Sequence, residues 1–152
     1  MSKPIVYIDM DGVLVDFQSG VNKLSPEVRA AYEPHCDNVP GIFATMDPMP
    51  GAVQAYKQLF KRFDVFVLSK PPHKSSSAYS DKRDWIAKHL GEHHTSRLIL
   101  SPVKHLSIGD FLIDDRPVPL FRGKQLLFGS EQHKDWTAVL EFFDALTIHG
   151  DD

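Results

Sequence analysis

The sequence predicts an α/β fold, built as a doubly wound, mostly parallel sheet with a small helical cap inserted after the first strand. Short, nearly continuous apolar runs alternate with segments of helical periodicity, and this alternation is typical of parallel sheets whose crossovers are helices. One proline-rich stretch fits neither pattern and separates the first run from the others. The alternation therefore predicts the sheet, and the interruption predicts the cap.

Five apolar runs are expected to form the strands. The first covers residues 4–9 and ends in Asp9. The others follow at 64–69, 97–101, 111–115 and 125–129. The first four runs each end in a polar or acidic residue. Ligands of open parallel sheets bind outside the carboxyl ends of the strands, so these polar ends are expected to converge on one site.

Three segments show the helical spacing of apolar residues, namely 52–60, 85–90 and 136–143. Gly91 is expected to end the second helix, and the third is expected to be capped near Ser130 or Asp135. The serines at 75–77 are expected to form a short loop. Together with the strands, these helices predict a Rossmann-like arrangement.

Residues 17–48 form the expected cap. This stretch contains four prolines, weak helical signals and no clear strand. The chain, 1–152, is expected to be a single domain with a core of 1–16 and 49–152 and a cap that lacks a core of its own. An insertion at this place would cover the site, exclude water and select substrates.

Composition narrows the class of partner. The chain has 152 residues and a formal net charge of −3, so neither a nucleic acid polymer nor an anionic membrane is expected to attract it. No apolar run approaches the ~20 residues that span a bilayer. The single cysteine, Cys36, permits no internal disulfide, and a cytoplasmic location is expected. The expected partner is a small molecule, and both a monomer and a homodimer remain open.

The segment after the first run carries the chemistry. Asp9, Asp11 and Gly12 form an Asp-x-Asp-Gly sequence that places two carboxylates side by side on a tight turn. One carboxylate can attack phosphorus and form an aspartyl-phosphate. The other can protonate the leaving oxygen and then deprotonate the attacking water. Since a phosphate dianion repels a carboxylate, a metal ion and a lysine are expected nearby.

Later strand ends supply the partners for this chemistry. Ser69 can donate a hydrogen bond to a phosphoryl oxygen, and Lys104 can neutralise the transferred group. Asp114 and Asp115 are adjacent acids that repel each other unless a cation is present. Mg²⁺ prefers carboxylate oxygens, so this pair predicts a Mg²⁺ site. Along the chain these residues occur in the order acid pair, hydroxyl, lysine and acid pair. This combination indicates phosphoryl-transfer chemistry more specifically than any one of the residues does alone.

Simpler interpretations exist for each of these features. Asp-x-Asp-Gly is a common turn composition, and a single strand-end serine or loop lysine is usually structural or solvated. A calcium loop is excluded because Val13 and Gly20 stand where acidic ligands are required. No zinc site is expected from the clustered histidines, which are interpreted as surface residues: His89, His93 and His94.

The motifs resemble those of the haloacid dehalogenase superfamily of phosphatases. Its four motifs correspond to Asp9 with Asp11, to Ser69, to Lys104, and to Asp114 with Asp115. Within that superfamily the chain is similar to the 5′(3′)-deoxyribonucleotidases. This second similarity lies in segments 9–17, 48–53 and 112–117, in Ser69 followed by Pro71, and in Trp85.

The resemblance implies a role for each matched residue. Asp9 would be the nucleophile and a metal ligand, and Asp11 the acid/base whose backbone carbonyl also binds the metal. Asp115, with Asp114 beside it, would complete the Mg²⁺ site. The implied substrate contacts are Asp11, Phe17, Phe43, Ser69, Lys70 and Lys104. The two phenylalanines would stack on or enclose the base, which supplies affinity with little demand on base identity.

The chain departs from the family pattern in three places. Lys70 stands where a second small hydroxyl residue is usual, and Pro102 stands where relatives carry an arginine. The cap is also shorter than theirs. The first two departures alter phosphate and leaving-group contacts, and the third alters base recognition.

The predicted function is a Mg²⁺-dependent phosphomonoesterase that removes the 5′- or 3′-phosphate of (deoxy)ribonucleoside monophosphates in deoxyribonucleotide catabolism. The nearest alternative is a phosphatase of the same superfamily that acts on a sugar phosphate or another small phosphate ester. A receiver-like phosphoacceptor signalling domain is the second alternative. It is disfavoured because the second and third strands end in Ser69 and Ser101 and not in the aspartate that a receiver phosphorylates.

Overall fold

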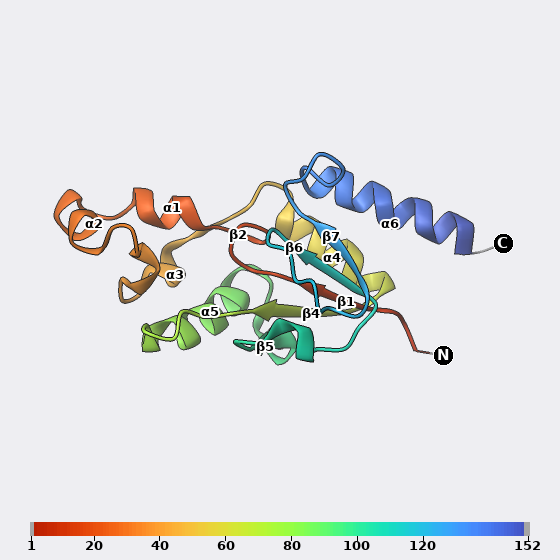
Figure 1. Cartoon of the computed structure of the whole chain (residues 1–152), viewed down its shortest axis with the longest axis horizontal. Helices are drawn as coiled ribbons and strands as arrows, with labels where there is room; N and C mark the ends of the chain where they lie inside the picture. The colour runs from red at the N-terminus through yellow and green to blue at the C-terminus, as the bar shows by residue number, and fades with distance from the viewer. Residues whose placement is uncertain (1, 151–152) are drawn as a thin grey trace.

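A five-stranded parallel sheet forms the centre of the protein. The computed structural model describes residues 2–150. Each strand overlaps one predicted run: β1 (Ile5–Ile8), β4 (Asp64–Ser69), β5 (Leu98–Leu100), β6 (Phe111–Asp114) and β7 (Lys124–Leu127). Their order is β5-β4-β1-β6-β7 (Figure 1). Because the chain moves outward from β1 first on one side and then on the other, the sheet is doubly wound, as predicted.

Apolar side chains cover both faces of this sheet. Val6, Ile8 and Val67 belong to the main core on one face. Tyr7 and Leu112 belong to a smaller cluster on the opposite face. Since successive side chains of a strand point to opposite faces, two buried faces require nearly continuous apolar runs, which are the pattern in the sequence.

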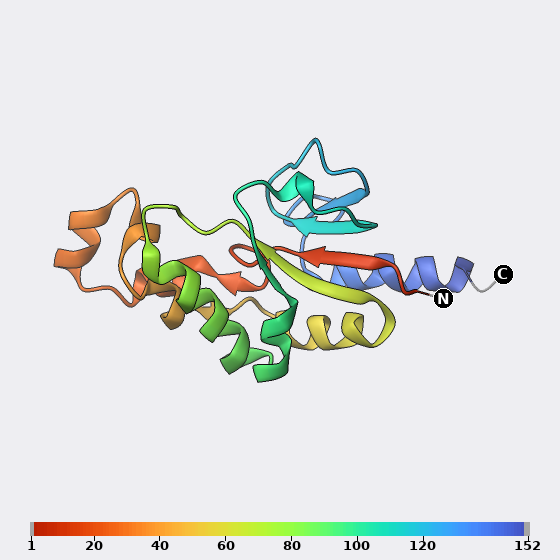
Figure 2. The same ribbon diagram turned by 90° about the horizontal axis from the view of Figure 1, so that it is seen from below.

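Three long helices contribute to the main core: α4 (Ala52–Arg62), α5 (Ser76–His89) and α6 (Trp136–Gly150). Figure 2 shows α4 and α5 along the same side of the sheet. The expected cap at Asp135 is confirmed, because its Oδ1 accepts a hydrogen bond from the Ala138 backbone at 2.9 Å. The expected serine loop is wrong, since Ser76 and Ser77 lie inside α5. Polar residues in the first half of that helix conceal its apolar period.

Residues 17–48 fold mainly into short helices beyond the carboxyl ends of the strands (Figure 1). They comprise α1 (Phe17–Asn22), α2 (Pro26–Tyr32), the 3₁₀ helix η1 (Cys36–Asn38), α3 (Ile42–Thr45) and the strand β3 (Asp47–Pro48). β3 pairs antiparallel with β2 (Val15–Asp16), so the expectation of no strand in this stretch is wrong. Two residues are too few to produce an alternating pattern, and proline is rare in strands.

The cap residues pack onto the main body. Val21, Ile42 and Phe43 lie in the same apolar cluster as the sheet residues. Two hydrogen bonds connect the cap to α5: the Gly41 backbone donates to Ser77 Oγ at 3.1 Å, and Trp85 Nε1 donates to the Met46 carbonyl at 2.9 Å. The cap is therefore held in a defined place next to α5.

Two further 3₁₀ helices, η2 (Glu92–Arg97) and η3 (Lys104–Leu106), flank β5. His94 of η2 is buried and lies 2.9 Å from the Tyr56 hydroxyl, which corrects its interpretation as a surface residue. Burial lowers the pKa of His94, with His93 and Arg97 adding to the effect. Burial also raises the pKa of Tyr56 to about 12, so the pair is uncharged at neutral pH. Among residues 2–150, no helix combines the length and the apolar character that a bilayer span requires.

Candidate active site

The first part of the site is the turn that follows β1. Asp9 is buried, and its backbone N–H donates to the Ile113 carbonyl at 2.9 Å, which fixes it against β6. The Met10 carbonyl then accepts hydrogen bonds from three successive residues, Val13, Leu14 and Val15. These bonds close the chain into a compact turn from which the side chains of Asp9 and Asp11 project. The Asp-x-Asp-Gly sequence therefore forms the tight turn that was predicted.

Gly12 is required at this turn for two separate reasons. Its φ is +81°, a conformation that other residues adopt only at a cost. A Cβ atom at this position would also lie 2.3 Å from Asp115 Oδ2. The absence of a side chain thus allows the loop after β6 to bring Asp115 against the turn after β1.

Replacing Gly12 by alanine is expected to displace Asp115 and to lower the rate of the phosphate-ester hydrolysis predicted from the sequence by about 10²-fold, the cost of moving a reacting group by about 1 Å. Unfolding in denaturant should show a loss of more than the ~1–2 kcal/mol that a left-handed conformation alone costs. Gly41→Ala is the matched control, since Gly41 also has a φ of +81° but a Cβ added there would meet no atom within 4 Å. Equal stability losses in the two variants, with full activity in Gly12→Ala, would contradict this account.

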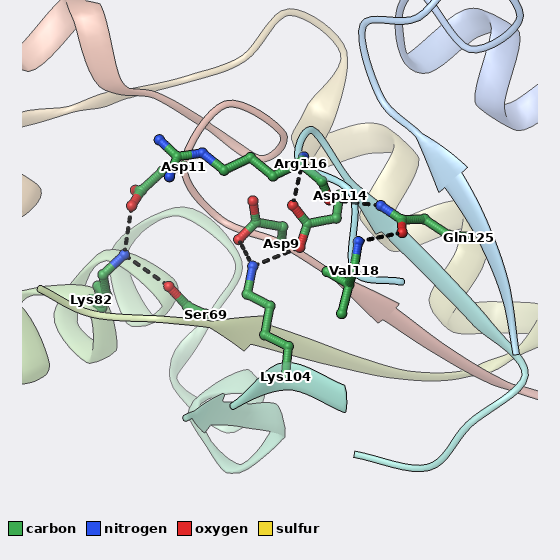
Figure 3. A network of polar contacts seen from close by, with 9 residues as sticks. All are labelled: Asp9, Asp11, Ser69, Lys82, Lys104, Asp114, Arg116, Val118 and Gln125. Carbon is green, nitrogen blue, oxygen red and sulfur yellow. Dashed lines mark hydrogen bonds and ion pairs between the residues drawn. The ribbon is translucent and has the colours of Figure 1, made fainter. Parts of the chain in front are cut away.

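An acidic cluster lies at the carboxyl ends of β1 and β6. One oxygen from each of Asp9, Asp114 and Asp115 lies within 4.8 Å of the others. Lys104, at the start of η3, donates to Asp9 Oδ1 at 2.9 Å and to Asp114 Oδ2 at 2.6 Å (Figure 3). The Arg116 backbone donates to Asp114 Oδ1 at 3.0 Å. The predicted acids and the predicted lysine therefore meet in one place.

The electrostatics of this cluster favour an additional cation. Burial raises the pKa of Asp9 well above its ordinary value, Lys104 opposes that shift, and Asp114 and Asp11 add to it. Loss of surrounding water likewise raises the pKa of Asp115, and the charge of Asp114 adds to the shift. Burial lowers the pKa of Lys104, but Asp9 and Asp114 outweigh it and the net pKa is raised. The ammonium group of Lys104 is thus shared between two carboxylates, Asp9 and Asp114, and additional positive charge would stabilise the cluster.

The residues present fit a hard divalent cation. Mg²⁺ binds oxygen ligands and commonly takes only one or two carboxylates. Asp9, Asp114 and Asp115 offer such oxygens from separate segments of the chain, and the close approach at Gly12 keeps Asp115 in the group. The donor set is therefore suited to Mg²⁺ and contains none of the sulfur or imidazole ligands that zinc prefers.

Asp11 and Ser69 are joined by a residue that the sequence interpretation missed. Lys82 of α5 donates to Asp11 Oδ2 at 3.0 Å and to Ser69 Oγ at 2.8 Å. Its side chain is 0% exposed. The sequence did contain a signal, because Lys82 follows Ala78 by four residues and precedes Trp85 by three, which places it on the buried face of the helix. A lysine on such a face requires partners, and these are Asp11 and Ser69.

A cavity of about 780 Å³ opens over these groups. Asp9, Asp11, Lys104 and the Asp114–Asp115 pair line this cavity, and so do Phe17, Phe43 and Lys70. The rings of Phe17 and Phe43 are 6.1 Å apart and inclined at 56°. Ser69 is buried beside the cavity and is not among its lining residues.

Arg116 is a second residue that the sequence interpretation did not assign to the site. It is exposed and lines the cavity together with Lys70 and Lys104. Its side chain extends over the site in Figure 3. Its position directly after Asp115 was the available signal. Pro102 lines the same cavity.

This arrangement can perform transfer of a phosphoryl group. Asp9 and Asp11 supply two carboxylates on one turn, and Lys104 supplies a positive charge next to Asp9. The cavity is of the size that encloses a small ligand, and its lining includes the rings of Phe17 and Phe43. A negatively charged ester would meet Lys104 beside the acidic cluster.

Comparison with known proteins assigns the chain to a family. The family model described as "5' nucleotidase, deoxy (Pyrimidine), cytosolic type C protein" matches residues 20–140. A candidate 5′(3′)-deoxyribonucleotidase of Vibrio phage KVP40 is 46% identical over 143 residues, which cover 92% of this chain and 84% of that protein. The cytosolic-type 5′(3′)-deoxyribonucleotidase of Homo sapiens is 30% identical over 169 residues, covering 89% of this chain and 78% of that protein.

A third relative extends the match to bacteria. A candidate 5′(3′)-deoxyribonucleotidase of Bordetella bronchiseptica is 32% identical over 139 residues, which cover 75% of each chain. The family model and the phage relative each cover more than two thirds of the sequence, and the family model includes the part of the candidate site from Ser69 to Asp115. The chain therefore belongs to the family of 5′ nucleotidase, deoxy (pyrimidine), cytosolic type C proteins, within the haloacid dehalogenase superfamily.

Proposed function

We propose that the protein hydrolyses the phosphate ester of nucleoside monophosphates, with deoxyribonucleotides as its principal substrates. The observation that carries this proposal is the meeting of Asp9, Asp11, Lys104 and the Asp114–Asp115 pair at one cavity, which Phe17 and Phe43 also line. Membership in the nucleotidase family and the names of the relatives support the same substrate class.

The reaction begins with attack on phosphorus by a carboxylate oxygen of Asp9, which forms a phosphate anhydride on that side chain and breaks the bond to the ester oxygen. Asp11 gives a proton to the departing ester oxygen. The same carboxylate then takes a proton from a water molecule that attacks the aspartyl-phosphate. Phosphate leaves and Asp9 is regenerated. The position of both carboxylates on one turn supports this division of roles.

We propose that Mg²⁺ is the cofactor, held by Asp9, Asp114, Asp115 and the backbone carbonyl of Asp11. When bound, the ion neutralises charge on the phosphoryl oxygens and aligns the group for attack. The raised pKa values of Asp9 and Asp115 support a site that requires added positive charge. Adjacent acids at Asp114 and Asp115 also lose their mutual repulsion when a cation lies between them and Asp9.

Two groups of side chains are proposed to bind the substrate. Lys104, Lys70 and the hydroxyl of Ser69 are proposed to hold the phosphoryl group. Phe17 and Phe43 are proposed to contact the base, since flat aromatic rings stack on every base without selecting one. The proximity of these two rings, 6.1 Å between centroids, supports a shared contact surface. The segment 17–48, which carries Phe43, would then act as a cap on a single domain.

A sugar phosphate or another small ester remains the rival substrate class. A flat base can stack on aromatic rings, and Phe17 and Phe43 both line this cavity. That composition favours a base over a sugar. The receiver-like alternative is disfavoured by the family match and by Asp11, whose acid/base role gives turnover and not a stable phosphoprotein.

A panel of phosphate monoesters tests the proposal. The purified protein with Mg²⁺ is expected to release phosphate from deoxyribonucleoside 5′- or 3′-monophosphates with a kcat/KM at least ~10-fold above that for glucose 6-phosphate, because only a base can use the aromatic wall. Excess EDTA is expected to stop the reaction, and added Mg²⁺ to restore it. Phosphate release is measured by a colorimetric assay.

Phe17→Leu is the informative companion variant for the panel. Leucine keeps an apolar side chain but removes the ring, so it should raise KM for nucleotides and leave turnover of glucose 6-phosphate unchanged. Equal or better hydrolysis of sugar phosphates by the unaltered protein would reject the nucleotidase assignment. Activity that persists after chelation would reject the metal.

The cytoplasm is the proposed location. The single cysteine, Cys36, is buried, and the chain therefore needs no oxidising compartment for disulfide formation. A nucleotide pool in the cytoplasm would also supply the proposed substrate.

A further inference from the structure

Lys82 is a fully buried lysine beside the candidate active site. Its side chain is 0% exposed and it lies on the face of α5 that also carries Ala78, Trp85 and Ile86. A charged amine is rarely buried unless it is paired, because the loss of its water is costly. Its contacts therefore identify the groups that the fold keeps next to this charge.

Three segments of the chain meet at this ammonium group. Nζ lies 3.0 Å from Asp11 Oδ2 on the turn after β1 and 2.8 Å from Ser69 Oγ at the end of β4. It also lies 4.3 Å from the centre of the Phe43 ring, which belongs to the cap. A cation over an aromatic face is attracted to it, and more strongly where water is excluded.

The chemistry of these contacts restricts what the partners can do. An ammonium group has three N–H donors and no acceptor, so Asp11 and Ser69 must both accept from Lys82. A serine hydroxyl has a single hydrogen, and that hydrogen is then left for another acceptor such as a phosphoryl oxygen. Asp11 is held through Oδ2, which limits rotation of its carboxyl group. Its Oδ1 is buried and has no hydrogen-bond partner among the described residues.

Lys82 and Lys104 serve different groups. Lys104 donates to Asp9 and Asp114, whereas Lys82 donates to Asp11 and Ser69 (Figure 3). Lys104 lines the cavity and Lys82 does not. Two residues that contact Lys82, Asp11 and Phe43, do line it. Lys82 can therefore affect a bound ester only by positioning the residues that it contacts.

We propose that Lys82 is a positioning residue for the hydrolysis. It orients the carboxyl group of Asp11 toward the bound phosphate ester, fixes the hydroxyl of Ser69 beside the cavity, and links both groups to the cap through Phe43. This inference rests on the proposed function, in which Asp11 is the acid/base. An error of about 1 Å in the placement of a reacting group can lower a rate by roughly 10²-fold.

Lys82→Met tests the proposal with two esters that differ in their leaving group. Turnover of deoxyuridine 5′-monophosphate is expected to fall by roughly 10²-fold, because its sugar oxygen must be protonated as it leaves. Release of nitrophenolate from p-nitrophenyl phosphate in the first turnover should fall by less than ~10-fold, because that leaving group needs no proton. Lys88→Met, an exposed lysine on the same helix, is the matched control and should change neither rate.

A double-mutant cycle shows whether Lys82 acts through Asp11. In the Asp11→Asn background, Lys82→Met is expected to lower nucleotide turnover by less than ~3-fold, since the group that it positions is already disabled. If the fold-loss of turnover in the double variant equals the product of the losses in the two single variants, the proposal is overturned. Equal losses of turnover for the two esters in Lys82→Met would also overturn it, because a purely structural role predicts equal losses.

The folded state of each variant is checked by circular dichroism. If Lys82→Met does not fold, Lys82→Arg replaces it, because arginine keeps the charge and the donors but changes their geometry. The same unequal loss for the two esters is expected, and equal losses would again overturn the proposal. If the unaltered protein cleaves p-nitrophenyl phosphate but no nucleotide, the proposed substrate is wrong, and the comparison is then made with phenyl phosphate, whose leaving group is poorer.

Discussion

Asp9→Asn is expected to lower phosphate release by roughly 10⁴-fold or more, the scale seen when an enzyme loses its nucleophile. An amide oxygen is a poor nucleophile, and no aspartyl-phosphate can form on it. The substitution preserves the shape of the side chain and an oxygen that can accept from Lys104. The measurement is steady-state phosphate release from a deoxyribonucleoside monophosphate with Mg²⁺.

The fold should survive this change. Burial raises the pKa of Asp9, and Lys104 opposes that shift, so asparagine avoids the cost of burying a charge but weakens the pair with Lys104. Unfolding in denaturant is therefore expected to give a free energy close to that of the unaltered protein. Asp84→Asn, at an exposed position, is the control and should retain full activity. Ordinary turnover in Asp9→Asn would remove the nucleophile assignment.

Asp11→Asn is expected to lower turnover by about 10²–10⁴-fold, the usual contribution of general acid/base catalysis. Asparagine cannot protonate the leaving oxygen or take a proton from the attacking water. It can still accept the hydrogen bond from Lys82, so the buried lysine keeps a partner. The loss should be larger for a nucleotide than for the first turnover of p-nitrophenyl phosphate, because only the nucleotide needs acid assistance.

The two aspartate variants should therefore show different kinetics. Asp9→Asn is expected to prevent hydrolysis of both esters, whereas Asp11→Asn is expected to release one equivalent of nitrophenolate and then to hydrolyse the aspartyl-phosphate slowly. A rapid-mixing experiment with p-nitrophenyl phosphate distinguishes them, since a burst of nitrophenolate followed by slow turnover is expected only for Asp11→Asn. A burst in the Asp9 variant, or none in the Asp11 variant, would reverse the assigned roles.

The sequence was sufficient to predict the centre of the site because parallel topology brings the carboxyl ends of strands together. Asp9, Lys104 and Asp114 each follow or end an apolar run, so their convergence required only the strand order. Lys104 Nζ lies 2.6 Å from Asp114 Oδ2 as a result. The five strands were predictable for the same reason, since strands buried on both faces form continuous apolar runs.

Features that depend on side-chain direction could not be predicted in the same way. Lys82 lies in a stretch of α5 whose polar residues conceal the helix, and its contact with Asp11 joins residues 71 positions apart. The pairing of β2 with β3 involves two residues on each side, too few for a periodic signal. His94 is buried because Tyr56 offers a partner from another helix. Each of these is a long-range contact whose partner no local pattern specifies.

The proposed reaction depends most on Asp9 as the residue that carries the phosphoryl group. Trapping the phosphoryl group on the protein tests this role directly. Asp11→Asn is mixed with p-nitrophenyl [³²P]phosphate and Mg²⁺, quenched in acid and digested, and the labelled peptide is sequenced by mass spectrometry. The expected label is stoichiometric, is released by hydroxylamine as acyl phosphates are, and maps to Asp9. A label on any other residue, or turnover with no covalent label at all, would contradict the central claim.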